Sequence, residues 1–304
     1  MRILFVTATR IGDAILSTGL LSHLTDRYPE ARITIASGSV VSPLFMAVPG
    51  LERVIELRKR RFSLHWLELW QQCVPQRWDI VIDLRRSALS WLLFTRDRRL
   101  PPPANLDVHR VTHLAATLGL ENSPPAPTCW TRPQDDSNAY QLIPDGAPVL
   151  AVAAAANWPG KQWRPERFAE LIGRLTGPDG VLPHSRVAIL GTTQELGQVK
   201  PLLESIPPER LLNLVGKTTL PVAAAALRRC ALFIGNDSGL MHMSAAVGIP
   251  TLGLFGPSHP SHYAPWGDLT AYVRTDASYD EIVSAPGYDH RNAGTVMDSL
   301  SVDK

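Results

Sequence analysis

The chain has 304 residues, of which 45% are hydrophobic and 19% charged, and its formal net charge is +2 at pH 7. This length suits one large domain or two of ordinary size, and the apolar content supplies a sizeable core. The small net charge argues against a dedicated nucleic-acid-binding protein, and no apolar run reaches the length of a membrane span.

The first part of the chain alternates apolar strands with helices. Strands are predicted over 2–7, 32–36, 53–57 and 79–83, and helices over 13–27, 42–47, 58–76, 87–94 and 108–118. This alternation is typical of a doubly wound parallel sheet. Residues 122–148 are rich in proline and polar side chains and are predicted to form a linker.

The same alternation restarts after the linker. Strands are predicted over 149–155, 186–190, 211–214, 231–234, 251–255 and 270–273, and helices over 165–175, 195–206, 221–229 and 240–247. We therefore expect an α/β protein with two Rossmann-like domains, residues 1–125 and 146–275, and a cleft between them. Residues 276–304 are expected to form a C-terminal tail.

The most distinctive stretch runs from Ile234 to Gly256. A strand ends there in a turn, a helix follows, and a second buried strand follows the helix. Asp237 or Ser238 suits the helix N-cap, and Gly239 leaves room for a ligand beside the backbone. A helix N-terminus at the carboxyl end of a parallel strand binds anions, which predicts a phosphate or diphosphate site with His242 one turn away. A capped helix with a turn glycine and a hydrogen-bonded histidine explains the same residues equally well.

Asp13 is the candidate for acid–base chemistry in the first half. The loop before it, Thr7 to Gly12, has one glycine where the dinucleotide fingerprint needs three, so a nicotinamide cofactor is not expected there. The ordinary role of Asp13 is a first-turn helix carboxylate. Its functional interpretation is a general base at the switch point of the sheet, which needs a closed cleft because a solvated carboxylate is a weak base.

Further candidates for binding a donor follow the strands of the second half. Lys161 lies in a loop after a strand, where it can neutralise a diphosphate as a point charge, although most loop lysines are simply exposed. Glu195 follows the next strand, where an acidic residue can accept hydrogen bonds from ribose hydroxyls or serve as a first-turn carboxylate. Thr192, Thr193 and Lys217 are weaker candidates for lining the same site.

A basic run opens the region after the third predicted strand, comprising Arg58, Lys59, Arg60 and Arg61. A solvated face is the usual explanation for such a run. More arginines at positions 85, 86, 96, 98 and 99, together with aromatic residues at 62, 66 and 70, favour an anionic acceptor or an anionic membrane surface as partner. The aromatic spacing matches no RNA-recognition module, so nucleic acid is not expected.

The three cysteines, Cys73, Cys129 and Cys230, lie far apart. They have no metal-ligand spacing, and an odd number gives no disulfide framework. We therefore expect no metal site and a reducing, cytoplasmic setting, with peripheral contact at the cytoplasmic face of an inner membrane as the alternative to free solution.

Four stretches together resemble one family. They are RILFVTATRIGDAILSTGLL at the start, WDIVIDLR at 78–85, KQWRPERFAEL at 161–171 and GNDSGLMHMSAAVGIPTLGLFGPSHP at 235–260. With these stretches the chain resembles glycosyltransferase family 9, the ADP-heptose:lipopolysaccharide heptosyltransferases of Gram-negative bacteria. The resemblance implies a GT-B fold whose C-terminal domain binds the donor and whose N-terminal domain binds the acceptor. It also implies an inverting transfer from a nucleotide sugar without a metal or other cofactor.

The resemblance assigns roles to particular residues. Asp13 matches the family's Gly-Asp motif and would be the catalytic base, and Lys161 matches a lysine that contacts the donor phosphates. The Asp-[Ser/Thr]-Gly-x-x-His motif around the diphosphate and sugar is matched by Asp237, Ser238, Gly239 and His242. Glu195 is a looser match to a donor-side acidic residue.

The sequence departs from the family in two places. Ala153 to Ala156 stand where the family often has Pro-Gly-Ala, and the chain stops at Lys304, where members usually continue into a last helix. We therefore expect altered phosphate contacts after that strand and a shortened tail.

The function implied is transfer of heptose from ADP-heptose to an anionic, lipid-linked lipopolysaccharide inner-core acceptor. The alternatives are another nucleotide sugar or glycan acceptor, a sugar-nucleotide epimerase of the same fold, and a non-catalytic nucleotide-sugar-binding protein. The epimerase is disfavoured by the motif match, and the non-catalytic protein by the intact Asp13.

Overall fold

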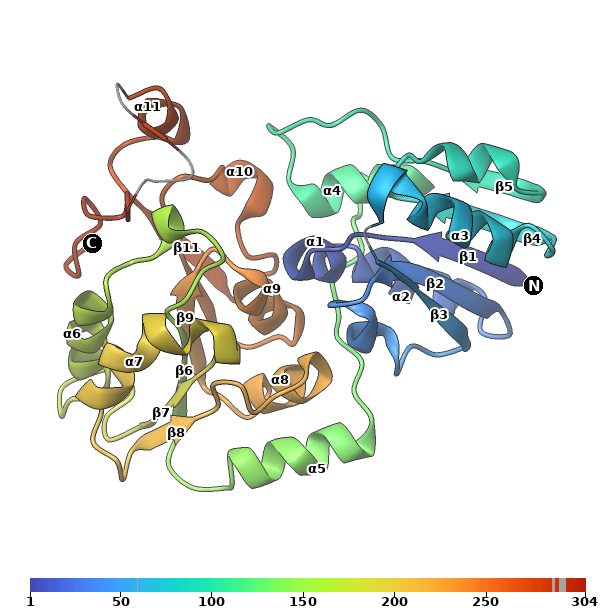
Figure 1. Cartoon of the computed structure of the whole chain (residues 1–304). Helices are drawn as coiled ribbons and strands as arrows, with labels where there is room; N and C mark the ends of the chain where they lie inside the picture. The colour runs from blue at the N-terminus through green and yellow to red at the C-terminus, as the bar shows by residue number, and fades with distance from the viewer. Residues whose placement is uncertain (59, 286–287, 290–293) are drawn as a thin grey trace. The chain divides into compact units, whose positions relative to one another are not determined.

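The computed structural model describes residues 1–58, 60–285, 288–289 and 294–304. The chain divides into two compact units, residues 1–132 (unit 1) and 133–304 (unit 2), each built on one parallel sheet with helices (Figure 1). Lys59, one of the residues predicted to bind the acceptor, lies outside the described residues. Within the described part of the chain, no helix combines the length and apolar character that crossing a bilayer requires.

The sheet of unit 1 has the strand order β3-β2-β1-β4-β5. Its strands are β1 (Arg2–Val6), β2 (Arg32–Gly38), β3 (Leu51–Leu57), β4 (Trp78–Asp83) and β5 (Thr95–Arg99). All neighbouring pairs are parallel, and the apolar strand β1 lies buried in the centre between β2 and β4. From β1 the chain first adds β2 and β3 on one side and then β4 and β5 on the other side, as in Rossmann-like sheets.

The helices of unit 1 are α1 (Ile11–Leu16), α2 (Thr18–Arg27), α3 (His65–Cys73) and α4 (Arg110–Ala115), with short 3-10 turns η1 (Ser42–Phe45), η2 (Arg61–Ser63), η3 (Ala88–Leu92) and η4 (Ala116–Leu118). The single helix predicted over 13–27 is broken at Ser17. The Ser17 hydroxyl donates to the Ala14 carbonyl at 2.7 Å and pairs with the Thr7 hydroxyl at 2.8 Å. Such local side-chain bonds compete with helical backbone bonds, which explains the break.

Strand β5 was not predicted from the sequence. Its residues, TRDRR, have the composition of a solvated loop, and the helical signal before them contracts to η3. The strand lies at the edge of the sheet beside β4. Charged side chains are common on edge strands because they discourage pairing with another chain.

The turn that leads from β4 to η3 is organised by Asp83. Its buried carboxylate accepts hydrogen bonds from the backbone N–H of Arg85 at 3.0 Å and from the backbone N–H and hydroxyl of Ser87 at 2.7 and 2.6 Å. Burial raises the pKa of the Asp83 carboxyl, and the bonds from Ser87 and Arg85 partly oppose that shift.

The sheet of unit 2 has the strand order β11-β10-β9-β6-β7-β8, again entirely parallel. Its strands are β6 (Val149–Ala153), β7 (Arg186–Ile189), β8 (Leu211–Asn213), β9 (Leu232–Asn236), β10 (Thr251–Phe255) and β11 (Thr270–Arg274). Its helices are α5 (Pro133–Leu142), α6 (Pro165–Thr176), α7 (Leu196–Ser205), α8 (Leu220–Leu227), α9 (Gly239–Ala246), α10 (Pro260–Tyr263) and α11 (Tyr279–Val283), with 3-10 turns η5 (Pro159–Lys161) and η6 (Thr193–Glu195). The fold class predicted from the sequence, α/β with two Rossmann-like sheets, is confirmed.

Helix α5 lies within the segment expected to be a linker. It begins with Pro133 and carries Asp135 and Asp136 in its first turn, both favourable at a helix N-terminus. It packs against α8, and the guanidinium of Arg229 lies 4.8 Å from the centre of the Tyr140 ring. The helix therefore belongs to unit 2.

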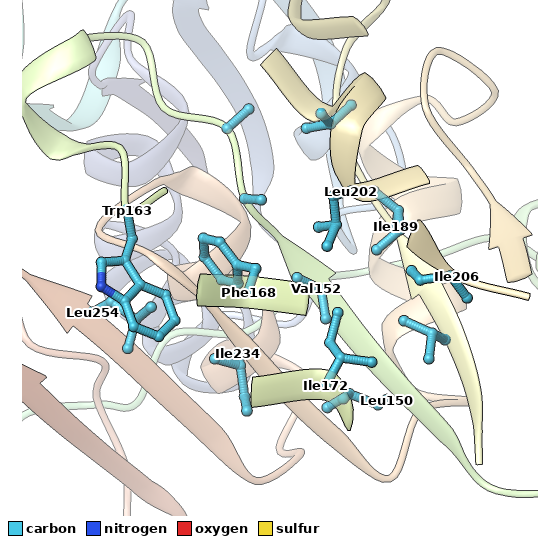
Figure 2. Packing of buried hydrophobic residues seen from close by; sticks show 14 of the residues in the cluster. Leu150, Val152, Trp163, Phe168, Ile172, Ile189, Leu202, Ile206, Ile234 and Leu254 are labelled. Atoms are coloured by element: carbon cyan, nitrogen blue, oxygen red, sulfur yellow. The ribbon is translucent and has the colours of Figure 1, made fainter. Parts of the chain in front are cut away.

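The core of unit 2 packs α6 and α7 against β6, β7 and β9 (Figure 2). Trp163 and Phe168 meet edge to face, with ring centroids 5.1 Å apart, in a geometry that aromatic pairs favour. Met297 and Leu300, from the segment expected to be a tail, are fully buried in the same cluster. This segment is therefore part of the core.

All three cysteines are buried, and burial raises the pKa of Cys73 to about 11 and that of Cys230 to about 12. Because the thiolate is the reactive form, iodoacetamide at pH 8 should modify none of the three in the folded protein. Mass spectrometry should show three adducts after denaturation in guanidinium, which serves as the control. Rapid native labelling of any cysteine would contradict this packing.

Candidate functional site

The strand order of unit 2 changes direction between β6 and β9. These two strands lie side by side, but the chain leaves them toward opposite edges of the sheet. Ligands of doubly wound proteins bind where the carboxyl ends of two such strands meet. The loop after β6 carries Lys161, and the loop after β9 carries Asp237.

Lys161, Asp237 and His242 form one cluster at this edge. The Lys161 ammonium makes a short ion pair with Oδ2 of Asp237. His242 Nε2 lies 3.9 Å from Oδ1 of the same carboxylate. The Asp237 side chain is only 6% exposed, whereas Lys161 is partly exposed. The structure thus brings Lys161 next to Asp237 and His242, which belong to a different predicted motif.

Ser238 and Gly239 lie at the beginning of α9, directly after Asp237. Ser238 is the N-cap and has an extended backbone, and Gly239 is the first helical residue. The backbone N–H groups of a first helical turn have no partner within the helix, and the helix dipole favours negative charge there. Among the residues that the structure describes, the buried Ser238 hydroxyl has no hydrogen-bond partner. Amides, a hydroxyl and an ammonium group are therefore available for an anion.

Asn236 joins the two loops of the cluster and was not predicted as a site residue. Its fully buried side chain accepts from the Trp163 backbone N–H at 3.2 Å and donates to the Ala154 carbonyl at 2.7 Å. Ala153 to Ala156 are buried, and Ala154 among them supplies this acceptor. Asn236 stands directly before the motif, but its sequence position alone gives no sign of these contacts.

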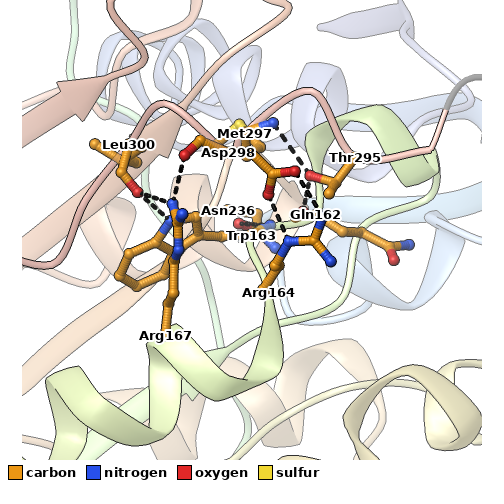
Figure 3. A network of polar contacts seen from close by, with 9 residues as sticks. All are labelled: Gln162, Trp163, Arg164, Arg167, Asn236, Thr295, Met297, Asp298 and Leu300. Atoms are coloured by element: carbon orange, nitrogen blue, oxygen red, sulfur yellow. Dashed lines mark hydrogen bonds and ion pairs between the residues drawn. The ribbon is translucent and has the colours of Figure 1, made fainter.

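The segment 295–304, the C-terminal strap, holds the Lys161 loop from the other side (Figure 3). The Thr295 hydroxyl donates to the Gln162 carbonyl, and the Val296 N–H donates to the Gly160 carbonyl at 3.3 Å. The Trp163 indole N–H donates to the Leu300 carbonyl at 2.8 Å.

The strap is also bound to α6. Asp298 accepts two parallel hydrogen bonds of 2.6 Å from Arg164, and its carbonyl accepts one of 2.8 Å from Arg167. The paired bonds hold the Arg164 pKa above, and the Asp298 pKa below, their ordinary values. Bidentate pairing fixes the orientation of the two side chains as well as the distance between them. Together with the contacts to Gly160, Gln162 and Trp163, these bonds attach the strap at several points around one short loop.

The remaining predicted donor residues lie after β7 and β8. Thr192 and Glu195 form a capping box, in which the Glu195 carboxylate accepts from the Thr192 N–H at 2.7 Å. Lys217 is exposed in the next loop, which is tied to the first by a 2.9 Å bond from the Gly216 N–H to the Gly191 carbonyl. Glu195 thus has the ordinary helix-start role, and the described contacts do not connect it with the Asp237 cluster.

Asp13 lies in the first turn of α1 in unit 1, next to the carboxyl end of β1. Its carboxylate is 3.8 Å from Nε of Arg110, which comes from α4, and both side chains are largely buried. Arg110 Nη1 also lies 2.8 Å from Nδ1 of His113. Arg110 was missed from the sequence because 97 residues separate it from Asp13 and no motif marks it.

The described members of the basic run follow β3 and are exposed. Arg58 pairs with Glu56 at 3.0 Å, and Arg60 pairs with Glu68 at 3.1 Å. The Arg61 guanidinium lies 5.7 Å from the centre of the Phe62 ring. These are local contacts, so acceptor binding by the run stays a prediction.

Comparison with known proteins places these features in context. The family model described as glycosyltransferase family 9 (heptosyltransferase) matches residues 71–284, more than half of the chain. Lipopolysaccharide heptosyltransferase 2 of Salmonella typhimurium is 24% identical, with 93% of this chain and 90% of the relative covered. The Escherichia coli enzyme of the same name is also 24% identical, over 93% of this chain and 90% of its own length.

Solved structures share the fold. A glycosyl transferase family 9 structure from Veillonella parvula is 22% identical, with a TM-score of 0.79 over 99% of this chain and 94% of its own. The E. coli heptosyltransferase WaaC with ADP is 18% identical, with a TM-score of 0.72 over 100% of this chain and 97% of its own. The GT-B class expected from the sequence is confirmed by this likeness.

The strap's contribution to unit 2 can be measured with a core substitution. Leu300→Ala should lower the free energy of unfolding by about 2–5 kcal/mol, because it leaves a cavity in a packed core. Urea denaturation measures the change. Val302→Ala removes a partly buried side chain from the same strap and should cost less. Equal stability of Leu300→Ala and the unsubstituted protein would show that the strap is not docked.

Proposed function

This chain belongs to glycosyltransferase family 9 (heptosyltransferase) and is a glycosyltransferase; from that premise we propose that it transfers heptose from ADP-heptose to an anionic lipopolysaccharide inner-core acceptor. The curated relatives are named as lipopolysaccharide heptosyltransferases, and one structural neighbour is described with ADP. The observation that carries the proposal is the cluster of Lys161, Asp237 and His242 at the N-terminus of α9.

The donor diphosphate is proposed to bind at the beginning of α9. The free amides of its first turn and the Ser238 hydroxyl can donate hydrogen bonds, and Lys161 supplies a positive charge. Negative charge grows on ADP as the bond between the sugar and the phosphate breaks. Hydrogen-bond donors and a positive charge that are already fixed in position stabilise that negative charge without having to reorganise in the transition state.

Asp13 is proposed to act as the general base. An acceptor hydroxyl attacks the anomeric carbon on the face opposite ADP, and Asp13 takes the hydroxyl proton. One carbon–oxygen bond forms, the bond to the diphosphate breaks with its electron pair leaving on ADP, and the configuration inverts. Arg110 lies beside the carboxylate and positions it. The basic run, Arg58 to Arg61, is proposed to bind acidic groups of the acceptor.

Removing the Lys161 ammonium should weaken donor binding. We expect Lys161→Ala to raise the Kd for ADP about tenfold or more, which corresponds to ~1.4 kcal/mol or more. Isothermal calorimetry measures this, with Lys200→Ala on the exposed surface of α7 as the matched control. The unsubstituted protein should also prefer ADP to UDP and GDP. Equal ADP affinity in Lys161→Ala and the unsubstituted protein would contradict the diphosphate assignment.

Replacing the proposed base should separate chemistry from donor binding. Asp13→Asn should lower kcat for transfer by about 10²–10⁴-fold, the usual contribution of a general base, while the Kd for ADP stays unchanged. Asp26→Asn, on the exposed part of α2, is the matched control. Near-normal transfer by folded Asp13→Asn would exclude Asp13 as the base.

A further inference from the structure

Unit 1 exposes an unusual group of large apolar side chains. Phe62 is 88% exposed and Phe94 is 72% exposed, and four more residues between them are at least 48% exposed, namely Leu64, Leu67, Trp91 and Leu92. Single exposed apolar residues are ordinary, but a contiguous exposed patch marks an interaction surface.

The six residues come from two neighbouring segments. The first is η2 with the beginning of α3, and the second is η3 with the residues that lead into β5. The Trp70 indole N–H on α3 donates to the Leu92 carbonyl of η3 at 3.2 Å. The Arg85 guanidinium, in the turn before η3, lies 5.3 Å from the centre of the Trp66 ring on α3. These contacts place the two segments side by side, and we call their exposed apolar residues and the arginines among them the arginine–aromatic face.

The sequence range that contains this face is also the basic part of the chain. Residues 58–99 contain ten Lys and Arg against four Asp and Glu, a net charge of +6 in a chain whose total is +2. The rest of the chain is therefore net negative. Arg61 lies against Phe62, and the Arg98 guanidinium lies 4.6 Å from the centre of the Trp91 ring. Positive charge and exposed aromatic rings thus alternate at close range.

We propose that the arginine–aromatic face docks on an anionic phospholipid membrane. Aromatic and aliphatic side chains enter the interface between headgroups and acyl chains, while arginines pair with lipid phosphates. A protein partner would account for the apolar side chains, but the strong local excess of positive charge favours a surface of dense negative charge. The inference rests on the proposed function in one respect, because a lipid-linked acceptor is presented at such a surface.

The proposed attachment to the membrane is reversible. It uses six apolar side chains and surface charge, and the described residues contain no membrane-spanning helix. Binding should therefore require anionic lipid and weaken as salt screens the arginines.

The test is co-sedimentation of the full chain with sucrose-loaded vesicles. Vesicles of 30% phosphatidylglycerol and 70% phosphatidylcholine should bind the protein about tenfold or more tightly than pure phosphatidylcholine, and 0.5 M NaCl should release it. Phe62→Ala combined with Trp91→Ala should weaken binding about tenfold. The control combines Val181→Ala with Leu269→Ala, two exposed apolar residues of unit 2, and should bind normally.

Three results would overturn the inference. They are equal binding to both vesicle types, no binding to either, and normal binding by the Phe62→Ala, Trp91→Ala variant. Analytical ultracentrifugation without lipid adds a further test. Self-association that this variant abolishes, together with no vesicle binding, would assign the face to contact between copies of this chain instead.

A second readout separates this inference from the proposed function. ADP affinity should be unchanged in the Phe62→Ala, Trp91→Ala variant, because neither residue belongs to the proposed catalytic or donor-binding set. Vesicle binding without any transfer by the unsubstituted protein would remove the proposed function and leave the docking surface standing. Transfer by the unsubstituted protein without any vesicle binding would support the proposed function and remove the docking surface.

Discussion

The ion pair between Lys161 and Asp237 is the contact on which the candidate donor site depends. It joins the loops after β6 and β9, the two strands between which the order of the sheet reverses. The Asp237 carboxylate is almost fully buried, and such a charge is costly without a partner. Asp237 also stands at the positive end of α9, where a diphosphate would compete with it for the Lys161 ammonium. In the proposed donor complex, Lys161 would therefore balance two anions, the Asp237 carboxylate and the diphosphate.

Lysine is a flexible point charge, so its loop has to be held by other groups. Asn236 fixes the inner side of the loop through Trp163 and Ala154, and the C-terminal strap fixes the outer side through Gly160, Gln162 and Trp163. The strap is in turn held by Met297 and Leu300 in the core and by Asp298 on α6. The packing of the hydrophobic core is thus linked to the position of Lys161, the lysine proposed to bind the donor.

Much of this arrangement follows from sequence patterns. Buried parallel strands are continuous apolar runs, and the turn before α9 combines a capping residue with glycine, so both sheets and the Asp237 motif were predictable. Edge strand β5 was not, because its charged residues have the composition of a loop. Helix α5 was hidden by the prolines around it. The strap has no periodic pattern, and its role depends on contacts with residues more than 130 positions away. Arg110 beside Asp13 is likewise a purely tertiary contact.

The most direct test of the donor-site assignment is an experimental structure of the protein with ADP. The account predicts phosphate oxygens about 3 Å from the first backbone amides of α9 and from Lys161 Nζ, within ordinary hydrogen-bond range. It also predicts that Lys161 then bridges Asp237 and the diphosphate. A diphosphate bound elsewhere, with the Lys161–Asp237 pair and the N-terminus of α9 unengaged, would contradict it.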